Sequence, residues 1–292
     1  MGLIIKNYEG AHKMISVAMT TYNGADYVAT QLRSILNQSV EVDEVVIFDD
    51  CSSDDTAGVV SKVEDSRVKF IRNPENVGYI QNFYNAIEAC TGDFIFLADQ
   101  DDVWEFDKVE KTMEVMKEYK CEAVCTNFSL IDKNGSELKT TEQFVPNRFF
   151  IELEKKNERI IDLSFDYLIL GNIVQGATYC ISKKTRELYL KIDNRTLYHD
   201  HQLLLIASKI GKVCFFNEKL IRYRIHENNT IGFGTKTNIF GLKRLKFPKI
   251  EPSMVTFLKQ LNRVSKVQHY FYYILYYYLR IPSIKNIIKT LK

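Results

Sequence analysis

Short apolar runs alternate with amphipathic stretches over the first 120 residues of the chain. Four of these runs have the length of buried strands, and each leads through a polar loop into apolar residues at helical spacing. This alternation predicts a doubly wound, mostly parallel α/β sheet of the Rossmann-like type. The expected strands are 14–20, 45–48, 68–71 and 94–97, and the expected helices are 28–36, 57–63, 79–89 and 107–119.

The second half of the chain has a less regular pattern. Apolar runs at 123–131, 173–181, 213–216 and 220–223 predict strands, and helices are expected over 183–190 and 202–209. Residues 142–162 are polar and poorly periodic, so we expect a mobile loop region over the site.

Three carboxylates, Asp99, Asp101 and Asp102, follow the fourth predicted strand. In an open α/β sheet the ligand crevice lies beyond the carboxyl ends of the strands, so we expect these side chains to line it. Clustered carboxylates repel one another unless a cation or protons compensate, and oxygen ligands favour Mg²⁺ or Mn²⁺. A solvated acidic turn that caps the next helix near Asp107 is the alternative.

The polar loops after the four strands carry none of the glycine fingerprints that bind dinucleotides or nucleoside triphosphates. A phosphate group at this edge would therefore be held by a metal rather than by a glycine-rich helix start.

Positive charge is concentrated at the end of the chain. The whole sequence carries a net charge of +2, but residues 236–292 hold twelve Lys or Arg against one acidic residue, Glu251. Aromatic residues crowd every face of a helix expected over 268–281, which favours packing on the main domain or in a homodimer. Contact with an anionic membrane surface is the alternative, and nucleic acid is not expected because no binding motif accompanies the charge.

Six cysteines lie mostly in apolar or helical stretches without zinc-site spacing, which indicates free thiols in a reducing cytosol. The N-terminus lacks a signal-peptide pattern, and no apolar run reaches the roughly 18–20 residues needed to span a bilayer. We expect a cytoplasmic protein, with peripheral attachment at the inner face of the membrane as a further option.

Five segments, in order along residues 14–232, resemble the family-2 glycosyltransferases of the GT-A fold, in particular the rhamnosyltransferase-like subgroup. The resemblance covers about three quarters of the chain. It implies a GT-A catalytic domain over 1–235 and a helical C-terminal extension over 236–292. The segments that carry it are Ser16–Asn23, Val46–Asp54, Asn76–Gly78, Phe96–Trp104, and the pair Tyr198–Asp200 and Tyr223–His226.

The resemblance implies inverting, metal-dependent sugar transfer from a UDP- or dTDP-linked donor to a hydroxyl of a glycan, glycolipid or glycoprotein in bacterial polysaccharide or glycoconjugate synthesis. Asp200 would be the general base, although His199 stands where the family has an acidic residue. Asp101, Asp102 and His226 would bind Mn²⁺ or Mg²⁺. The other candidates are the nucleotide ligands Thr20, Tyr22, Asn23, Asp50, Asn76, Gly78, Asn82, Asp99, Gln100 and Asp101, and the donor or acceptor contacts Gln175, Gly176, His199 and Trp104.

Simpler explanations stand beside these roles. Asp200 could cap a helix, His226 could be an ordinary surface histidine, and Trp104 could pack in the core. A haloacid dehalogenase-type phosphatase would use Asp99 and Asp101, but its motif normally follows the first strand rather than the fourth. A non-catalytic sugar-nucleotide-binding module on the same fold is the other alternative.

Overall fold

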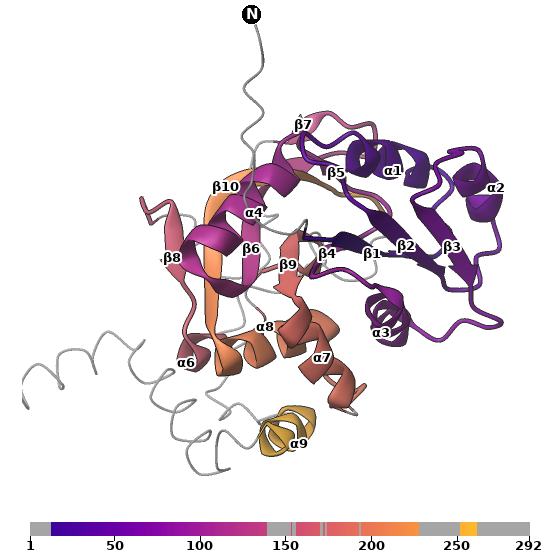
Figure 1. Ribbon diagram of the computed structural model, residues 1–292. Coiled ribbons are helices and arrows are strands. Elements are labelled where there is room, and N and C mark those ends of the chain that lie inside the picture. The colour runs from indigo at the N-terminus through magenta and orange to yellow at the C-terminus, as the bar shows by residue number, and fades with distance from the viewer. Residues whose placement is uncertain are drawn as a thin grey trace, which may run out of the picture.

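A computed structural model describes residues 13–138, 153, 156–169, 172, 174–192, 194–227 and 252–261. Its centre is a ten-stranded sheet whose main path runs β3-β2-β1-β4-β9-β6-β10-β5, with β7 beside β6 and β8 beside β10 (Figure 1). The first four strands are parallel neighbours, as predicted: β1 (Ile15–Thr21), β2 (Glu44–Asp49), β3 (Val68–Arg72) and β4 (Phe94–Ala98). The predicted α/β sheet of the doubly wound type is confirmed, but the sheet as a whole is mixed, and these four strands form the main part that is parallel as expected.

The second half of the sheet is mixed. β9 pairs antiparallel with both β4 and β6, whereas β6 and β10 are parallel. Its strands are β5 (Val103–Trp104), β6 (Cys121–Ile131), β7 (Glu137–Leu138), β8 (Ile160–Asp162), β9 (Tyr179–Ser182) and β10 (Lys212–Arg224).

Two strand predictions need correction here. The apolar run at 173–181 forms a 3-10 turn over Gly176–Thr178 before β9 begins, so only its end is a strand. The runs at 213–216 and 220–223 form one strand, β10, because the polar residues between them continue the pairing with β6 through an irregular register.

Helices cover both faces of the sheet. In Figure 1, α1 (Val28–Leu36) and α2 (Thr56–Ser61) lie above β1–β3, and α3 (Tyr79–Ala89) lies below them. α4 (Lys108–Tyr119) joins the α1 side, since the Gln38 side-chain carbonyl accepts a hydrogen bond from the Val109 N–H. The remaining helices are α6 (Phe165–Leu168), α7 (Lys183–Lys191), α8 (His199–Ile210) and α9 (Pro252–Gln260), which gather in the lower part of Figure 1.

The core lies on both faces of the central strands. β1 and β4 are nearly continuous apolar runs, and Val17, Met19 and Leu97 are fully buried, as expected for parallel strands covered on both sides. The strand ends that follow this core therefore emerge at one edge, where the polar loops gather.

The extension predicted for 236–292 is described only over residues 252–261. Phe257, Leu258 and Leu261 are buried there and belong to the main core. Of the loop expected over 142–162, residues 160–162 instead form β8, which pairs with β10, and residues 142–152 lie outside the described residues. The aromatic helix expected over 268–281 also lies outside them. Within the described part of the chain, no helix has the length and apolarity needed to cross a membrane.

Candidate active site

The acidic loop Asp99–Asp102 connects β4 to β5 and meets the end of β10. Because β5 pairs with β10, residues 224–226 lie beside this loop. The Arg224 N–H donates to Asp102 Oδ1 over 3.0 Å, and His226 Nε2 lies 2.7 Å from Asp101 Oδ2. Asp102 is only 1% exposed, so this is not the solvated turn of the simpler explanation. The fold thus brings together the three residues predicted to bind a metal, Asp101, Asp102 and His226, from segments far apart in the sequence.

Negative charge is poorly compensated at this loop. Burial, together with the charges of Asp101 and Asp200, raises the pKa of Asp99 to about 7. Burial and the charges of Asp101 and Asp99 also raise the pKa of Asp102. Asp102 Oδ2 is buried and has no hydrogen-bond partner among the described residues. A buried carboxylate oxygen without a partner is costly, and a bound cation would relieve that cost.

The residues at this loop fit a hard divalent cation by chemistry, since carboxylate oxygens are its preferred ligands. In their present arrangement, no group of three or more His, Cys, Asp or Glu side chains in the described part of the chain forms a ready metal site. His226 is bonded to Asp101, so a cation at Asp101 would compete with that contact or share it.

Asp50 ties the end of β2 to the loop that precedes α3. Its Oδ1 accepts a hydrogen bond from the Val77 N–H over 2.8 Å, and its Oδ2 accepts one from the Gly78 N–H over 2.9 Å. Gly78 has φ +81°, a conformation that strains other residues, so glycine suits this turn. Asn76 adds a contact, because its side-chain carbonyl accepts a longer bond from the same Gly78 N–H, over 3.2 Å.

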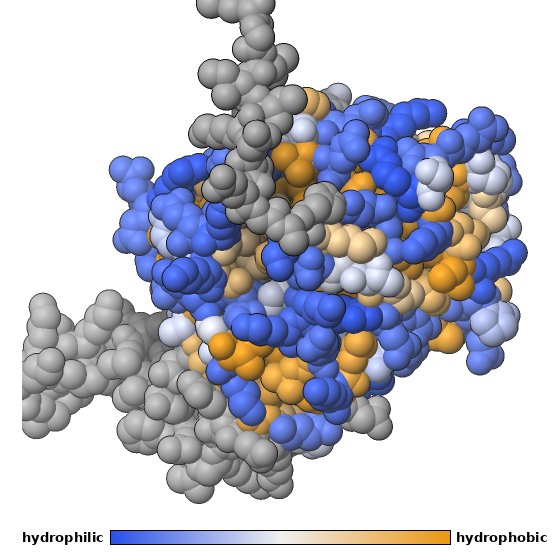
Figure 2. Space-filling model, viewed as in Figure 1, coloured by the Kyte–Doolittle hydropathy of each residue, from blue (hydrophilic) through white to orange (hydrophobic). Residues whose placement is uncertain are grey.

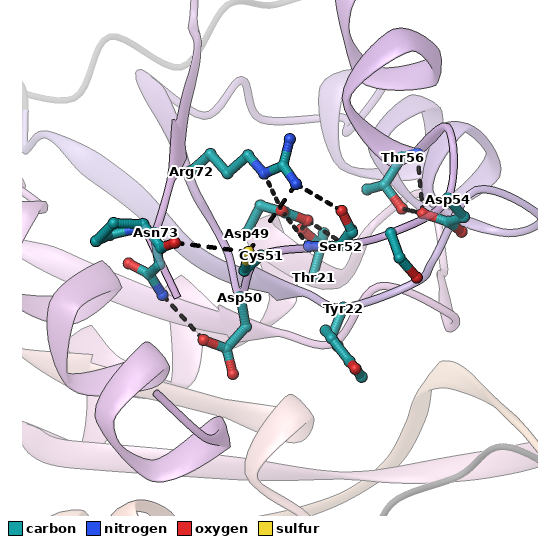
Figure 3. Close-up of polar contacts among 12 residues, drawn as sticks. Thr21, Tyr22, Asp49, Asp50, Cys51, Ser52, Asp54, Thr56, Arg72 and Asn73 are labelled. Atoms are coloured by element: carbon teal, nitrogen blue, oxygen red, sulfur yellow. Dashed lines mark hydrogen bonds and ion pairs between the residues drawn. The ribbon is translucent and has the colours of Figure 1, made fainter. Parts of the chain in front are cut away.

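Asp49, which the sequence did not single out, holds the loop that follows β2 by hydrogen bonds (Figure 3). It is fully buried and accepts hydrogen bonds from the Thr21 hydroxyl and from the Ser52 hydroxyl and N–H. In Figure 3 the Asp50 carboxylate points away from this network, toward the side on which the Tyr22 ring also lies. The only sequence signal for Asp49 is its place beside Asp50 at the end of a strand.

Several predicted nucleotide ligands make loop-to-loop contacts in this structure. Gln100 exchanges two hydrogen bonds with the backbone of Tyr22, and Asn82 bonds the Phe48 carbonyl and the Asn73 side chain. Asn23 accepts a hydrogen bond from the Ser53 N–H. Thr20 is half-buried at the end of β1, and Tyr22 is 49% exposed. Among these residues, Tyr22 therefore has a solvent-exposed ring, while Gln100 and Asn82 hold the loops in place.

Asp200 lies in the first turn of α8, with its carboxylate held on both sides. Its Oδ1 accepts a hydrogen bond from the His201 N–H, and its Oδ2 accepts one from Asn172 Nδ2 over 2.6 Å. The predicted neighbour Gly176 does lie against it, because a Cβ on Gly176 would come within 3.0 Å of the Asp200 Cβ. Gln175, half-buried, directly precedes this glycine. Asn172 was missed by the sequence reasoning, since a lone asparagine carries no pattern.

The two remaining candidates, His199 and Trp104, are buried. The His199 ring stacks on Phe83 with centroids 4.0 Å apart, and neither ring nitrogen has a hydrogen-bond partner in the described residues. Burial lowers the pKa of His199, which favours the neutral ring. Trp104 is 2% exposed and packs beside Phe96, with centroids 5.6 Å apart. A substrate contact by either ring stays a prediction.

Three comparisons with known proteins bear on this arrangement. The family model for glycosyl transferase family 2 matches residues 16–183. The putative teichuronic acid biosynthesis glycosyltransferase TuaG of Bacillus subtilis is 35% identical over 74% of this chain and 81% of that protein. The dTDP-rhamnosyl transferase RfbG of Shigella flexneri is 27% identical over 81% of this chain and 83% of that protein.

A solved structure shares the fold. The crystal structure of Staphylococcus aureus TarS 1–349 in complex with UDP-GlcNAc superposes with a TM-score of 0.58 at 18% identity. The match covers 74% of this chain and 60% of that one. At this identity the likeness concerns the architecture alone, which is of the GT-A type.

Proposed function

This chain belongs to glycosyl transferase family 2, and from that membership we propose that it moves a sugar from a UDP- or dTDP-linked donor to a glycan hydroxyl. It is a glycosyltransferase, and its relatives connect it with bacterial polysaccharide synthesis. The phosphatase alternative is thereby set aside. The proposal adds the donor class, a divalent cation, an inverting displacement and the roles of individual residues.

The observation that carries the proposal is that Asp200, at the start of α8, lies near enough to the acidic loop for its charge to act on Asp99. The charges of Asp101 and Asp200 both act on Asp99, and raise its pKa further above its ordinary range than burial would alone. A transferase needs a site for the departing diphosphate close to a base for the acceptor hydroxyl. The acidic loop Asp99–Asp102 after β4 would serve the diphosphate, and Asp200 in α8 would serve as the base.

In this proposal Asp50, Tyr22 and the 76–78 turn bind the nucleotide. Asp101 and Asp102, with His226 beside them, would hold Mn²⁺ or Mg²⁺, and the cation would supply positive charge opposite the diphosphate. Asp200 accepts the proton of the attacking acceptor hydroxyl. In this proposal the base and the leaving group act from opposite sides of the sugar carbon, so that a single displacement would invert its configuration.

The first experiment measures donor binding and transfer together. Thermal shift with UDP-, dTDP- and GDP-sugars in the presence of Mn²⁺ identifies the donor, and transfer is then measured against a panel of alkyl glycoside acceptors. We expect Asp200→Asn to lower kcat by about a hundredfold or more while the donor-induced thermal shift persists. We expect Asp101→Asn to lose the Mn²⁺-dependent part of that shift.

Asp107→Asn is the matched control, because Asp107 precedes α4 and pairs with Lys111 away from the acidic loop. Wild-type transfer rates in both Asp101→Asn and Asp200→Asn would contradict the assigned mechanism. Donor binding by the wild-type protein without transfer to any acceptor would instead favour the sugar-nucleotide-binding module.

A further inference from the structure

Two tyrosines near the start of α8, Tyr79 and Tyr198, have no role in the proposed transfer so far. Their rings are nearly parallel, with centroids 6.3 Å apart and 22° between their planes. Tyr198 is 43% exposed, whereas Tyr79 is half-buried behind it. Burial, with Tyr198 and the charge of Asp200 adding to it, raises the pKa of Tyr79 to about 12. Tyr79 is therefore uncharged and packs beside the solvent-exposed ring of Tyr198.

The pair connects the two halves of the site. Tyr198 directly precedes α8 and stands two residues before Asp200, while Tyr79 begins α3 immediately after Gly78. The Gly78 N–H donates to Asp50, so the Tyr79 backbone is anchored to the nucleotide loop. An exposed ring at this junction lies at the start of α8, two residues before the base in the sequence.

The segment that leads into Tyr198 is held by its own hydrogen bonds. Asn194 Oδ1 accepts from the N–H groups of Thr196 and Leu197, and Gln202 Nε2 donates to the Leu197 carbonyl over 2.6 Å. The Arg195 guanidinium lies 3.4 Å from the Tyr84 ring centroid, which fixes the same segment to α3. An exposed aromatic side chain on a fixed backbone loses little entropy when a ligand covers it.

We propose that Tyr198, backed by Tyr79, is the platform on which the pyranose ring of the acceptor stacks while its hydroxyl approaches Asp200. A pyranose has an apolar C–H face and a rim of hydroxyls. Tyr198 offers an apolar ring for that face, and Asp200 offers an acceptor for a rim hydroxyl. The inference rests on the proposed function, because it takes Asp200 as the base that faces the acceptor.

The test separates acceptor binding from donor binding. With the full chain, the KM for an alkyl glycoside acceptor is measured beside the donor KM for wild type, Tyr198→Ala, Tyr198→Leu and Tyr198→Phe. We expect Tyr198→Ala and Tyr198→Leu to raise the acceptor KM by about fivefold to tenfold, and Tyr198→Phe to stay near wild type. The donor KM is expected to stay unchanged throughout.

Phe106→Ala is the matched control, since Phe106 is an aromatic ring, 67% exposed, between β5 and α4. An unchanged acceptor KM in Tyr198→Leu would overturn the platform, and so would an equal rise in the donor KM. Unfolding midpoints identify a variant that fails to fold, and Tyr198→Leu keeps the bulk of the side chain for that reason.

A second measurement holds even if the wild-type protein transfers nothing. Saturation-transfer NMR with the methyl glycosides of glucose, N-acetylglucosamine, galactose and rhamnose reports pyranose binding without turnover. Binding by wild type that is lost in Tyr198→Leu and kept in Tyr198→Phe would support the platform although the proposed function had failed. Absence of binding by wild type to all four glycosides would overturn it.

Discussion

Individual side chains at this site divide into groups that can face a substrate and groups that hold them. Asp200 is of the first kind, and Asn172 is of the second, because its amide donates to the Asp200 carboxylate over 2.6 Å. Tyr179 extends the chain of contacts. Its hydroxyl donates to the Val174 backbone carbonyl and lies 3.5 Å from Asn172 Oδ1, the side-chain amide oxygen. The base is thus oriented from a buried residue of β9.

Replacement of Asn172 by alanine tests this orientation. Without the amide donor the carboxylate loses a hydrogen bond, and its direction becomes less defined. We expect kcat to fall by about tenfold. Steady-state kinetics measures this effect.

Asn37→Ala serves as the comparison, because Asn37 follows the last residue of α1 and its side chain donates a hydrogen bond to the local Arg33 carbonyl. An equal drop in kcat in Asn37→Ala would point to a general structural effect rather than to orientation of the base by Asn172.

At the scale of elements, α4 places an ionisable side chain, Lys108, in the core. Lys108 is fully buried at the start of α4, and its Nζ lies 4.9 Å from the Trp104 ring centroid. In the described residues this Nζ has no hydrogen-bond partner. Burial lowers the pKa of Lys108 to about 7, so the charged form is held there at a cost.

Lys108→Met is expected to stabilise the protein most at low pH. Lysine in the unfolded chain ionises near 10.5, and the folded value is about 7. Between these values the unfolded state binds more protons, so the wild-type free energy of unfolding rises with pH across this window and is lowest below pH 7. Methionine keeps the volume without the charge, and we expect a gain of about 1 kcal/mol or more at pH 6.

Denaturant unfolding of both proteins at pH 6 and at pH 9.5 makes the comparison. Lys111→Met controls for a lysine on the same helix with a solvent-reachable side chain. A loss of stability in Lys108→Met that is equal at the two pH values would contradict the linkage.

Elements with local patterns were predictable, and elements defined by distant pairing were not. The apolar run Phe94–Leu97 predicted β4, and the spacing of Val28, Leu32 and Ile35 predicted α1. Both patterns consist of residues close together in the sequence. Nothing near Tyr179–Ser182 says that this strand inserts antiparallel between β4 and β6. The same holds at the site, where Asp101 and Asp200 follow recognisable segments but Asn172 gains its role only through contact.

For the molecule as a whole, the C-terminal extension begins as part of the main body. Figure 2 shows hydrophilic residues over most of one face, with apolar residues gathered near α7 and α8. α9 contributes Phe257 and Leu258 to the core, Leu261 follows the helix and joins them, and Lys209 of α8 donates to the Leu261 carbonyl. A boundary at 235 therefore separates sequence regions rather than two independent cores, as far as the described residues extend.

Phe257→Ala tests this continuity. Removal of a fully buried phenylalanine leaves a cavity, and we expect the free energy of unfolding to fall by about 3 kcal/mol. Thr256→Ala, an exposed position on the same helix, is expected to have little effect. Calorimetry should show one shifted transition, whereas an unchanged main transition with a separate small one would indicate an independent unit.

The insertion of β9 has a consequence for the time course of biosynthesis. β4 and β6 are complete once residue 131 has been made, but the strand that joins them comes from residues 179–182. During translation of the intervening stretch both strands expose an unpaired edge, which is the part of a sheet most prone to join other chains. Association of the nascent chain with other chains is therefore most expected during this interval of about fifty residues.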